Sequence, residues 1–190
     1  MKNTFTEKMK KNPIIAAVKD LDNLDTALKS ECNIIFLLCG SIFNIRDAVD
    51  KVKKAGKMIF IHVDLLEGFS KDAMALKYIS EEIKPDGIVS TKNSQLKAAK
   101  SLGLLTVQRI FIIDSLSIDT AIKASQMIEP DAIEILPGIM PRITKQLSST
   151  LSVPVIVGGL VSQAEEVENA IKNGALGVSS SEKLLWRIKL

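Results

Sequence analysis

The sequence predicts an α/β fold: a compact, TIM-like (β/α)8 barrel in a single domain of 190 residues. That length is close to the length of one domain. Eight short apolar runs rich in Ile and Val recur at intervals of 17 to 29 residues, with helical patterns between them. Continuous apolarity is typical of parallel strands buried on both faces. An open doubly wound sheet also fits the alternation, but eight units favour closure, because the side chains of eight parallel strands just fill a barrel.

The predicted strands are the eight apolar runs, which are short and similar in length. They cover residues 14–18, 34–38, 58–63, 87–90, 104–107, 132–136, 154–158 and 175–179. Residues 1–12 are expected to form a short N-terminal extension of the single domain. No linker or second domain is expected in the rest of the chain.

Helices are predicted between the strands, each starting at a residue that commonly caps a helix. The first covers residues 44–56, with apolar side chains on one face and a glycine at its end. Others are expected over 70–85 and 93–103. A fourth covers 162–174, where the pattern Ser162-x-x-Glu165 matches a capping box.

The composition excludes several classes of protein. Charged residues make up 25% and apolar residues 46%, as in ordinary globular domains. No apolar run approaches the roughly 18 residues that cross a bilayer, and the first 13 residues lack the apolar segment of a secretory signal. Two cysteines, Cys32 and Cys39, are too few for a disulfide scaffold or a four-ligand zinc site. We therefore expect a reduced, cytoplasmic protein with no membrane partner.

Charge and aromatic content limit the kinds of partner. The net charge of +3 and the pI of about 8.8 permit an anionic partner without requiring one. Aromatic residues make up only 4%, so binding of single-stranded nucleic acid by base stacking is not expected. The densest basic stretch carries Lys51, Lys53, Lys54 and Lys57. Such a run is usually a solvated helix face, but these lysines are also candidates for contact with RNA phosphates.

A phosphate site is predicted where the last two strands end. In βα barrels, functional residues lie at the C-terminal ends of the strands, and phosphate often binds in the loops after strands 7 and 8. Gly158 and Gly159 follow the seventh run, and Ser179, Ser180 and Ser181 follow the eighth. Glycine lets backbone N–H groups approach an anion, and a following helix start adds further donors. The alternative is a tight turn for the glycines and a helix cap for the serines.

Acidic side chains at the same end are candidates for several kinds of chemistry. Asp64, Glu67, Asp114 and Glu134 could bind Mg²⁺, act as acid and base, or accept hydrogen bonds from substrate hydroxyls. Glu134 lies inside an apolar run, and alternation points its side chain into the barrel. A buried carboxylate needs a partner, and the candidates are Lys19, Lys92 and Arg109. An internal ion-pair network is the simpler interpretation.

The remaining polar candidates give weaker signals. His62 is the only histidine; it could face either way along its strand, and a lone histidine is more often structural than a ligand. No histidine cluster or HExxH motif supports a metal site, and no cofactor is expected. Cys39 has no base beside it and is interpreted as a small core residue.

Longer strings resemble a specific family. HVDLLEG (62–68), QRIFIIDS (108–115) and IEILPG (133–138) are more specific than general barrel sequence. With PIIAAVKD (13–20), FLLCGSI (36–42), DGIVSTK (86–92), VPVIVGGLVS (153–162) and GVSSS (177–181), they are similar to the glycerol uptake operon antiterminator regulatory proteins. The resemblance runs from about Pro13 to the end of the chain.

The resemblance implies a small TIM barrel that regulates transcription and has no enzymatic step. Such a protein senses glycerol 3-phosphate and binds the leader mRNA of glycerol-metabolism genes, so that transcription passes a terminator. The residues after strands 7 and 8 would then hold the phosphoryl group of this effector. The glycerol hydroxyls would contact the remaining polar candidates, which are Lys19, Asp64, Glu67, Lys92, Arg109 and Glu134.

Two other functions stay open at this point. One is an enzyme that acts on a small phosphorylated polyol, either an isomerase or a Mg²⁺-dependent phosphodiesterase, although no recognisable acid–base pair supports it. The other is a metabolite-binding protein that acts through a protein partner. For an RNA-binding regulator, a homodimer that pairs two basic surfaces would give a larger footprint on RNA.

Overall fold

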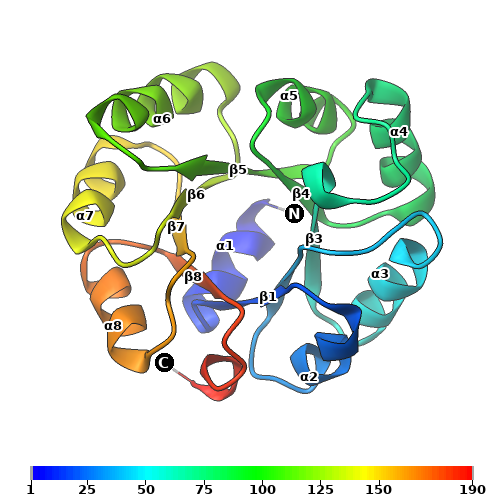
Figure 1. Ribbon diagram of the computed structural model, residues 1–190, viewed down its shortest axis with the longest axis horizontal. Helices are drawn as coiled ribbons and strands as arrows, with labels where there is room; N and C mark the ends of the chain where they lie inside the picture. The colour runs from blue at the N-terminus through cyan, green and yellow to red at the C-terminus, as the bar shows by residue number, and fades with distance from the viewer. Residues whose placement is uncertain (1, 190) are drawn as a thin grey trace.

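The computed structural model describes residues 2–189 and has the predicted fold, a closed barrel of eight parallel strands in the order β1 to β8 (Figure 1). The strands are β1 (Ile14–Val18), β2 (Ile34–Leu37), β3 (Met58–His62), β4 (Gly87–Ser90), β5 (Leu105–Phe111), β6 (Ala132–Leu136), β7 (Val155–Gly158) and β8 (Gly177–Ser180). Six of the predicted apolar runs contain a whole strand, and the other two, 104–107 and 175–179, overlap β5 and β8. Pairing of β1 with β8 closes the sheet.

Helices surround the barrel, and one precedes it. They are α1 (Lys2–Lys11), α2 (Leu24–Leu28), α3 (Ile45–Lys54), α4 (Ala73–Tyr78), α5 (Asn93–Ser101), α6 (Ser115–Ile128), α7 (Pro141–Thr150) and α8 (Ala164–Lys172). A π-helical segment, Ile79–Ile83, continues α4. After β8 the described chain forms only a short 3-10 turn, Leu185–Arg187, where a regular barrel would have its eighth outer helix.

Two apolar layers explain why the strands carry continuous apolar runs. One set of strand side chains, including Ile35, Ile61 and Ile133, packs outward against the helices. The alternate set, including Phe36 and Phe60, fills the barrel interior. Because both faces of each strand are buried, neither face can be polar along most of its length.

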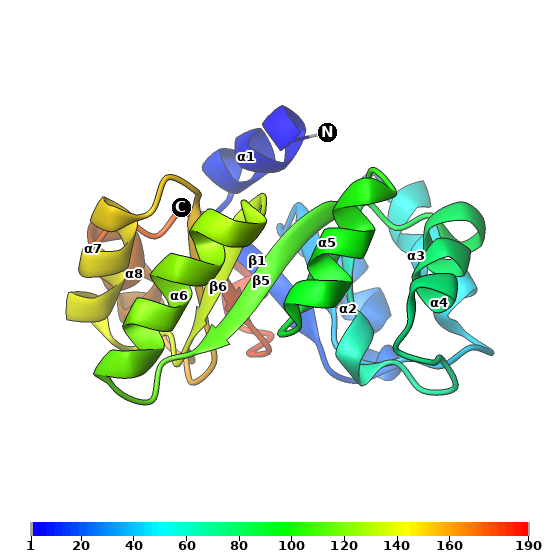
Figure 2. The same ribbon diagram turned by 90° about the horizontal axis from the view of Figure 1, so that it is seen from above.

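Helix α1 closes one end of the barrel. We call the end where the strands begin the base, and the end where they finish the mouth. Figure 2 shows α1 lying across the base. Phe5 and Met9 of α1 are fully buried in the interior layer, and the ring of Phe5 lies 4.7 Å from that of Phe60. Part of the segment predicted only as an extension is therefore a helical plug.

Element boundaries differ from the predictions in places where side chains decide the cap. Helix α4 begins later than predicted, because Asp72 rather than Ser70 accepts the hydrogen bond from the N–H of Ala75. The capping box of α8 is one residue further on than predicted. It consists of Gln163 and Glu166, not Ser162 and Glu165.

Strand β5 is longer than its apolar run. It continues through Gln108 and Arg109 to Phe111, since β6 pairs with it as far as the match of Phe111 with Leu136. The sequence prediction ended this strand at residue 107, before Gln108 and Arg109. Arg109 therefore lies within a strand and not in the loop after it.

Candidate functional site

A small cavity opens at the mouth of the barrel, above the interior layer. Its volume is about 160 Å³, below the roughly 300–1,000 Å³ of sites for drug-sized ligands, so it suits a small metabolite. Strands β1, β5, β6 and β8 and the residues that follow β1, β2, β7 and β8 contribute its walls. The lining residues are Ala17, Lys19, Leu38, Arg109, Glu134, Leu136, Gly159, Leu160, Val161, Ser179, Ser180 and Ser181.

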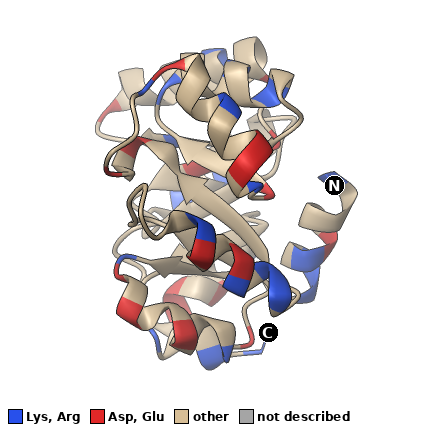
Figure 3. Ribbon diagram, turned by 90° about the vertical axis from the view of Figure 1, so that its right-hand side faces the viewer, with Lys and Arg blue, Asp and Glu red and all other residues tan. Residues whose placement is uncertain are grey.

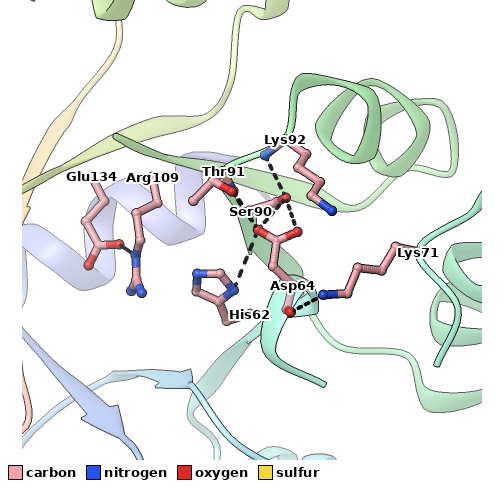
Figure 4. A network of polar contacts seen from close by, with 8 residues as sticks. All are labelled: His62, Asp64, Lys71, Ser90, Thr91, Lys92, Arg109 and Glu134. Carbon is pink, nitrogen blue, oxygen red and sulfur yellow. Dashed lines mark hydrogen bonds and ion pairs between the residues drawn. The ribbon is translucent and has the colours of Figure 1, made fainter. Parts of the chain in front are cut away.

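Arg109 and Glu134 form a buried ion pair in the floor of this cavity, drawn in Figure 4. The Nε of Arg109 donates to Oε2 of Glu134 at 2.6 Å, and the hydroxyl of Ser179 donates to Oε1 at 2.5 Å. Glu134 is fully buried and Arg109 is 9% exposed. Of the three proposed partners for Glu134, the structure selects Arg109, because the two residues are matched across β5 and β6.

Gly158 makes room for this polar group. It is the last residue of β7, and a Cβ atom built on it would collide with the hydroxyl of Ser179 and lie 2.7 Å from Oε1 of Glu134. Any larger residue would push the carboxylate or the hydroxyl away. Gly158 therefore acts behind the cavity, and it does not line the cavity wall.

The loops after β7 and β8 bring backbone N–H groups to the same cavity. Gly159 and Leu160 both have positive φ angles, of 73° and 63°, a conformation that glycine adopts easily and leucine rarely. Among the described residues, the backbone N–H groups of Gly159, Leu160 and Ser181 have no hydrogen-bond partner. Three such groups around a small cavity can bind an anion.

The three predicted serines have different environments. The hydroxyl of Ser179 is taken up by Glu134, and that of Ser180 donates to the carbonyl of Val161 while accepting from the N–H of Glu182. Ser181 is exposed at the mouth. Only Ser181 therefore presents a hydroxyl with no partner among residues 2–189 to a ligand in the cavity.

Part of the start of α8, where free donors were expected, is capped by the protein itself. The carboxylate of Glu166 accepts hydrogen bonds from the N–H groups of Ser162 and Gln163, at 2.7 and 3.0 Å. These two bonds lower the pKa of Glu166, so the helix start is capped by the protein's own anion. The carboxylate of Glu166 would repel a phosphate here, so the turn after β7 is the better anion site.

A second polar network lies beside the cavity and contains Asp64 (Figure 4). Asp64 accepts hydrogen bonds from the hydroxyl of Ser90 at 3.0 Å and the N–H of Thr91 at 2.8 Å. Burial opposes ionisation of this carboxyl, but the bonds from Thr91 and Ser90 outweigh it and lower the pKa of Asp64. Asp64 therefore joins the loop after β3 to the end of β4 and does not line the cavity.

Two other predicted contacts also lie outside the cavity. Lys92 is exposed at the start of α5, and Figure 4 shows its side chain extending away from Arg109. Glu67 lines a neighbouring hollow of about 340 Å³, which also includes Lys19 and Cys39. Of the six predicted polyol contacts, the structure brings Lys19, Arg109 and Glu134 together at the cavity.

His62 points into the barrel between the two networks. Its Nδ1 lies 3.9 Å from Oδ2 of Asp64 and makes no hydrogen bond within the described chain. Burial, together with the nearby charge of Arg109, lowers the pKa of His62 to about 4. The ring is therefore neutral at pH 7, and its contact with Asp64 is not an ion pair there.

Apolar side chains that the sequence analysis did not name complete the cavity wall. They include Leu38 and Leu136 from the strand ends and Val161 from the loop after β7. Leu136 lies two residues after Glu134, so the alternation that placed Glu134 inside the barrel would also have identified Leu136. The loop residues have no such signal.

Three of the four lysines proposed for RNA contact, Lys53, Lys54 and Lys57, lie together at the base where β3 begins, and Lys53 and Lys57 line one hollow there. Lys51 borders a hollow that contains Asp22, Asp25 and Asp47. Lys57 is half-buried, and its ammonium group donates to the carbonyls of Ser30 and Cys32; burial lowers its pKa. Lys53 donates to the carbonyl of Lys84 at 2.6 Å, and Lys54 is exposed.

Neither a metal cluster nor a membrane span appears in the part of the chain that the structure describes. Within residues 2–189, no three His, Cys, Asp or Glu side chains are grouped so that they could hold a metal ion. No helix in the same range is long and apolar enough to cross a membrane. Burial raises the pKa of the Cys39 thiol to about 11, so this cysteine is a thiol at neutral pH.

Comparison with known proteins identifies close relatives. The Escherichia coli protein YgcP is 42% identical over 180 residues, which are 95% of this chain and 94% of that protein. The crystal structure of the glycerol uptake operon antiterminator regulatory protein from Listeria monocytogenes matches with a TM-score of 0.88 and 33% identity, over 92% of this chain and 95% of that one. A glycerol uptake operon antiterminator-related protein from Thermotoga maritima matches at 0.81 and 28%, over 92% and 98%.

More distant structures share the fold alone. They include the N-acetylmannosamine-6-phosphate 2-epimerase of Clostridium perfringens, with a TM-score of 0.67 and 14% identity over 92% of this chain and 88% of that one. A model of the family described as "Glycerol-3-phosphate responsive antiterminator" matches residues 14–186. On this match and these relatives, the chain belongs to the glycerol-3-phosphate responsive antiterminator family.

Proposed function

We propose that this chain binds glycerol 3-phosphate in the mouth cavity and, when it is bound, binds the leader mRNA of glycerol-metabolism genes so that transcription passes a terminator. The observation that carries the proposal is that two different kinds of polar group line one small cavity. One wall presents unpaired backbone N–H groups, and the other presents a buried guanidinium–carboxylate pair.

The phosphoryl group fits the wall of unpaired donors. The N–H groups of Gly159, Leu160 and Ser181 can each donate to a phosphate oxygen, and the hydroxyl of Ser181 adds a fourth donor. The exposed side chain of Lys19 lines the same cavity and contributes positive charge. This set contains the predicted residues Gly159 and Ser181, with Gly158 and Ser179 holding the floor behind them.

The glycerol hydroxyls fit the polar floor. A hydroxyl both donates and accepts, so it can bridge a carboxylate and a guanidinium. Arg109 uses only its Nε–H for Glu134, which leaves its remaining N–H groups for a ligand. The floor therefore suits a polyol better than an apolar group.

The state of the acidic groups favours a sensor over an enzyme. Both carboxylate oxygens of Glu134 already accept hydrogen bonds, from Arg109 and Ser179. Asp64 is held by Ser90 and Thr91 and lies outside the cavity. A general base must be free to take up a proton from the substrate, whereas Glu134 is held in an ion pair with Arg109, and Asp64 lies outside the cavity.

Calorimetric titration tests the ligand, with glycerol and inorganic phosphate as comparisons. We expect saturable binding of glycerol 3-phosphate and much weaker binding of either fragment alone. Ser181→Asp would place a carboxylate against the phosphoryl group and should weaken binding at least tenfold, about 1.4 kcal/mol or more. Ser152→Asp, an exposed change at the base, is the matched control and should leave the affinity unchanged.

The regulatory part of the proposal predicts a coupling between ligand binding and RNA binding. If glycerol 3-phosphate increases RNA affinity by some factor, RNA must increase glycerol 3-phosphate affinity by the same factor. Equal binding of all three compounds, or steady consumption of glycerol 3-phosphate by the protein, would contradict the proposal.

A further inference from the structure

Positive charge is concentrated at the base of the barrel. The base comprises α1, the final one or two residues of α3, α5 and α8, and the loops leading into the strands, with described residues 2–13, 29–33, 53–57, 84–86, 100–104, 129–131, 151–154, 172–176 and 188–189. These segments hold 12 of the 25 basic side chains but only five of the 22 acidic ones. Because the whole chain carries +3, the base carries +7 and the remainder carries −4.

Four of the five acids at the base are already engaged, and the fifth, Glu7, is exposed on α1. Three of them form ion pairs: Asp131 with Lys2 at 3.7 Å, Glu129 with Lys100 at 3.9 Å and Glu31 with Lys189 at 3.1 Å. A fourth, Asp86, accepts a hydrogen bond from the N–H of Ile59.

Several basic side chains at the base have no such partner. Within residues 2–189, no carboxylate lies within ion-pair distance of Lys10, Lys11, Lys29 or Lys54. The first two lie at the end of α1 and Lys54 ends α3, and Figure 3 shows Lys and Arg positions on α1 and on the helix ends beside it. The exposed charge of the base is therefore positive.

A groove runs between α1 and the segment that joins α3 to β3. Its volume is about 270 Å³, and its walls include Lys8 from α1 and Lys53 from α3, together with Asp86. The ammonium of Lys8 donates to the carbonyl of Gly56 at 3.0 Å, and that of Lys53 to the carbonyl of Lys84 at 2.6 Å. Each ammonium has three donors, so these held lysines keep donors for phosphate oxygens.

The base lacks the side chains that read unpaired bases. Among the described segments of the base, Phe5 is the only aromatic residue, and its ring is fully buried. The exposed Phe43 and Phe111 lie at the mouth instead. A basic surface without stacking platforms suits the phosphate backbone of a folded RNA better than a single strand.

We propose that the base, centred on α1, is the surface that docks folded leader RNA. The inference rests on the proposed function and adds its location: RNA binds at the end of the barrel opposite the cavity for glycerol 3-phosphate. The ligand then never touches the RNA. Its effect must pass through the barrel interior, where the Phe5 ring of α1 packs on Phe60 and Phe60 packs on Phe36.

Two triple variants with the same change in charge test this assignment. The base variant carries Lys10→Glu, Lys11→Glu and Lys54→Glu. The flank variant carries Lys97→Glu, Lys123→Glu and Lys145→Glu on α5, α6 and α7, where all three lysines are exposed. Both changes take the net charge from +3 to −3, so a general charge effect would be equal in the two proteins.

The readout is the affinity for a labelled transcript of the leader of a glycerol-metabolism operon, measured from 50 to 200 mM KCl with glycerol 3-phosphate saturating. The base variant should bind more than about tenfold more weakly, and its slope of log affinity against log salt should fall by about 2 to 3. The flank variant should stay within about threefold of the wild type. Both should bind glycerol 3-phosphate with unchanged affinity by calorimetry.

The outcomes separate the two proposals. The base assignment is overturned if the base variant binds the transcript as tightly as the wild type does. It is also overturned if the flank variant loses as much RNA affinity as the base variant. Either result leaves the proposed function standing. Wild-type protein that binds glycerol 3-phosphate but binds no RNA at any salt concentration overturns the RNA-binding function, and the base assignment falls with it.

Discussion

The two ends of the barrel are built from opposite chemistry. At the base, Phe5 and Met9 of α1 fill the barrel with apolar side chains, and lysines cover the outside. At the mouth, Arg109, Glu134 and Ser179 place charge inside the barrel, beneath an open cavity. One end is sealed, and the other leaves polar groups for a small molecule.

The difference shows which end serves stability and which serves binding. Burying a large apolar side chain contributes about 1.5–3 kcal/mol. A buried ion pair contributes little, because the loss of hydration offsets most of the attraction between the charges. The polar floor of the mouth is therefore not needed for folding, whereas the plug of the base is.

Truncating the plug should destabilise the fold without affecting the ligand. Phe5→Ala removes a fully buried ring and should lower the free energy of unfolding by about 3–5 kcal/mol, measured by urea denaturation. Phe43→Ala is the control, because Phe43 is 93% exposed at the mouth, and it should change stability by less than about 0.5 kcal/mol. Folded Phe5→Ala protein that no longer binds glycerol 3-phosphate would break the proposed separation of the two ends.

Removing the charge of Glu134 should cost both stability and binding. Glu134→Gln leaves the Arg109 guanidinium buried without a counter-ion, at a cost of about 3 kcal/mol. Glu168→Gln, an exposed change on α8, is the control.

A double variant sharpens this result. With Arg109→Met and Glu134→Leu together, stability should return to within about 1 kcal/mol of the wild type, while calorimetry should still detect no glycerol 3-phosphate binding. Recovery of both properties would show that the pair has no role in the ligand site.

Acidification should destabilise the mouth through His62. In the unfolded chain its pKa is near the ordinary 6.5, but in the folded protein burial lowers it to about 4. The unfolded state therefore binds the proton more readily, and stability is lost as the pH falls from about 6.5 towards 4. Between pH 7 and pH 5 this loss should be about 2 kcal/mol.

The variant His62→Gln provides the comparison for this pH effect. It should show a much smaller loss of stability over the same interval, because most carboxyl groups titrate below pH 5. Urea denaturation at the two pH values measures both proteins. Equal losses in the wild type and in His62→Gln would show that His62 is not responsible.

The smallest expected effect is on phosphate binding, and it distinguishes the turn after β7 from the start of α8 as the anion site. Glu166→Ala removes the cap of α8 and should lower stability by about 1 kcal/mol. If phosphate uses the turn after β7, the affinity for glycerol 3-phosphate should stay within about twofold of the wild-type value. A clear gain in affinity would mean that the uncapped start of α8 binds the phosphoryl group instead.

The sequence predicted the barrel because its strands carry a local signal. The run IIFL of β2 is apolar at every position, and VIVG of β7 is apolar up to its final glycine. Continuous apolarity is the pattern of a strand buried on both faces. The signal stopped early in β5, where Gln108 and Arg109 interrupt it. Pairing with β6 extends that strand, and such pairing is a non-local contact.

Helix α1 could not be predicted in the same way. Only Phe5 and Met9 are buried among its charged and polar residues, and they are buried because the barrel base is open to receive them. The contact of Phe5 with Phe60 joins residues far apart in the chain. No short window of sequence contains that information.

The candidate site was predictable only where side chains lie within a strand. Alternation placed Glu134 inside the barrel, and the structure puts it there. Asp64 and Lys92 follow the ends of their strands, where the local turn sets the direction of the side chain. The structure turns Asp64 towards Ser90 and leaves Lys92 in solvent.

The most direct test of the whole account is the affinity of the wild-type protein for leader RNA with and without saturating glycerol 3-phosphate. If ligand binding at the mouth controls RNA binding at the base, RNA should bind more tightly when the ligand is present, by a factor of about 5 to 150. The same factor should appear in the affinity for glycerol 3-phosphate when RNA is saturating. Equal RNA affinities with and without the ligand would contradict the account.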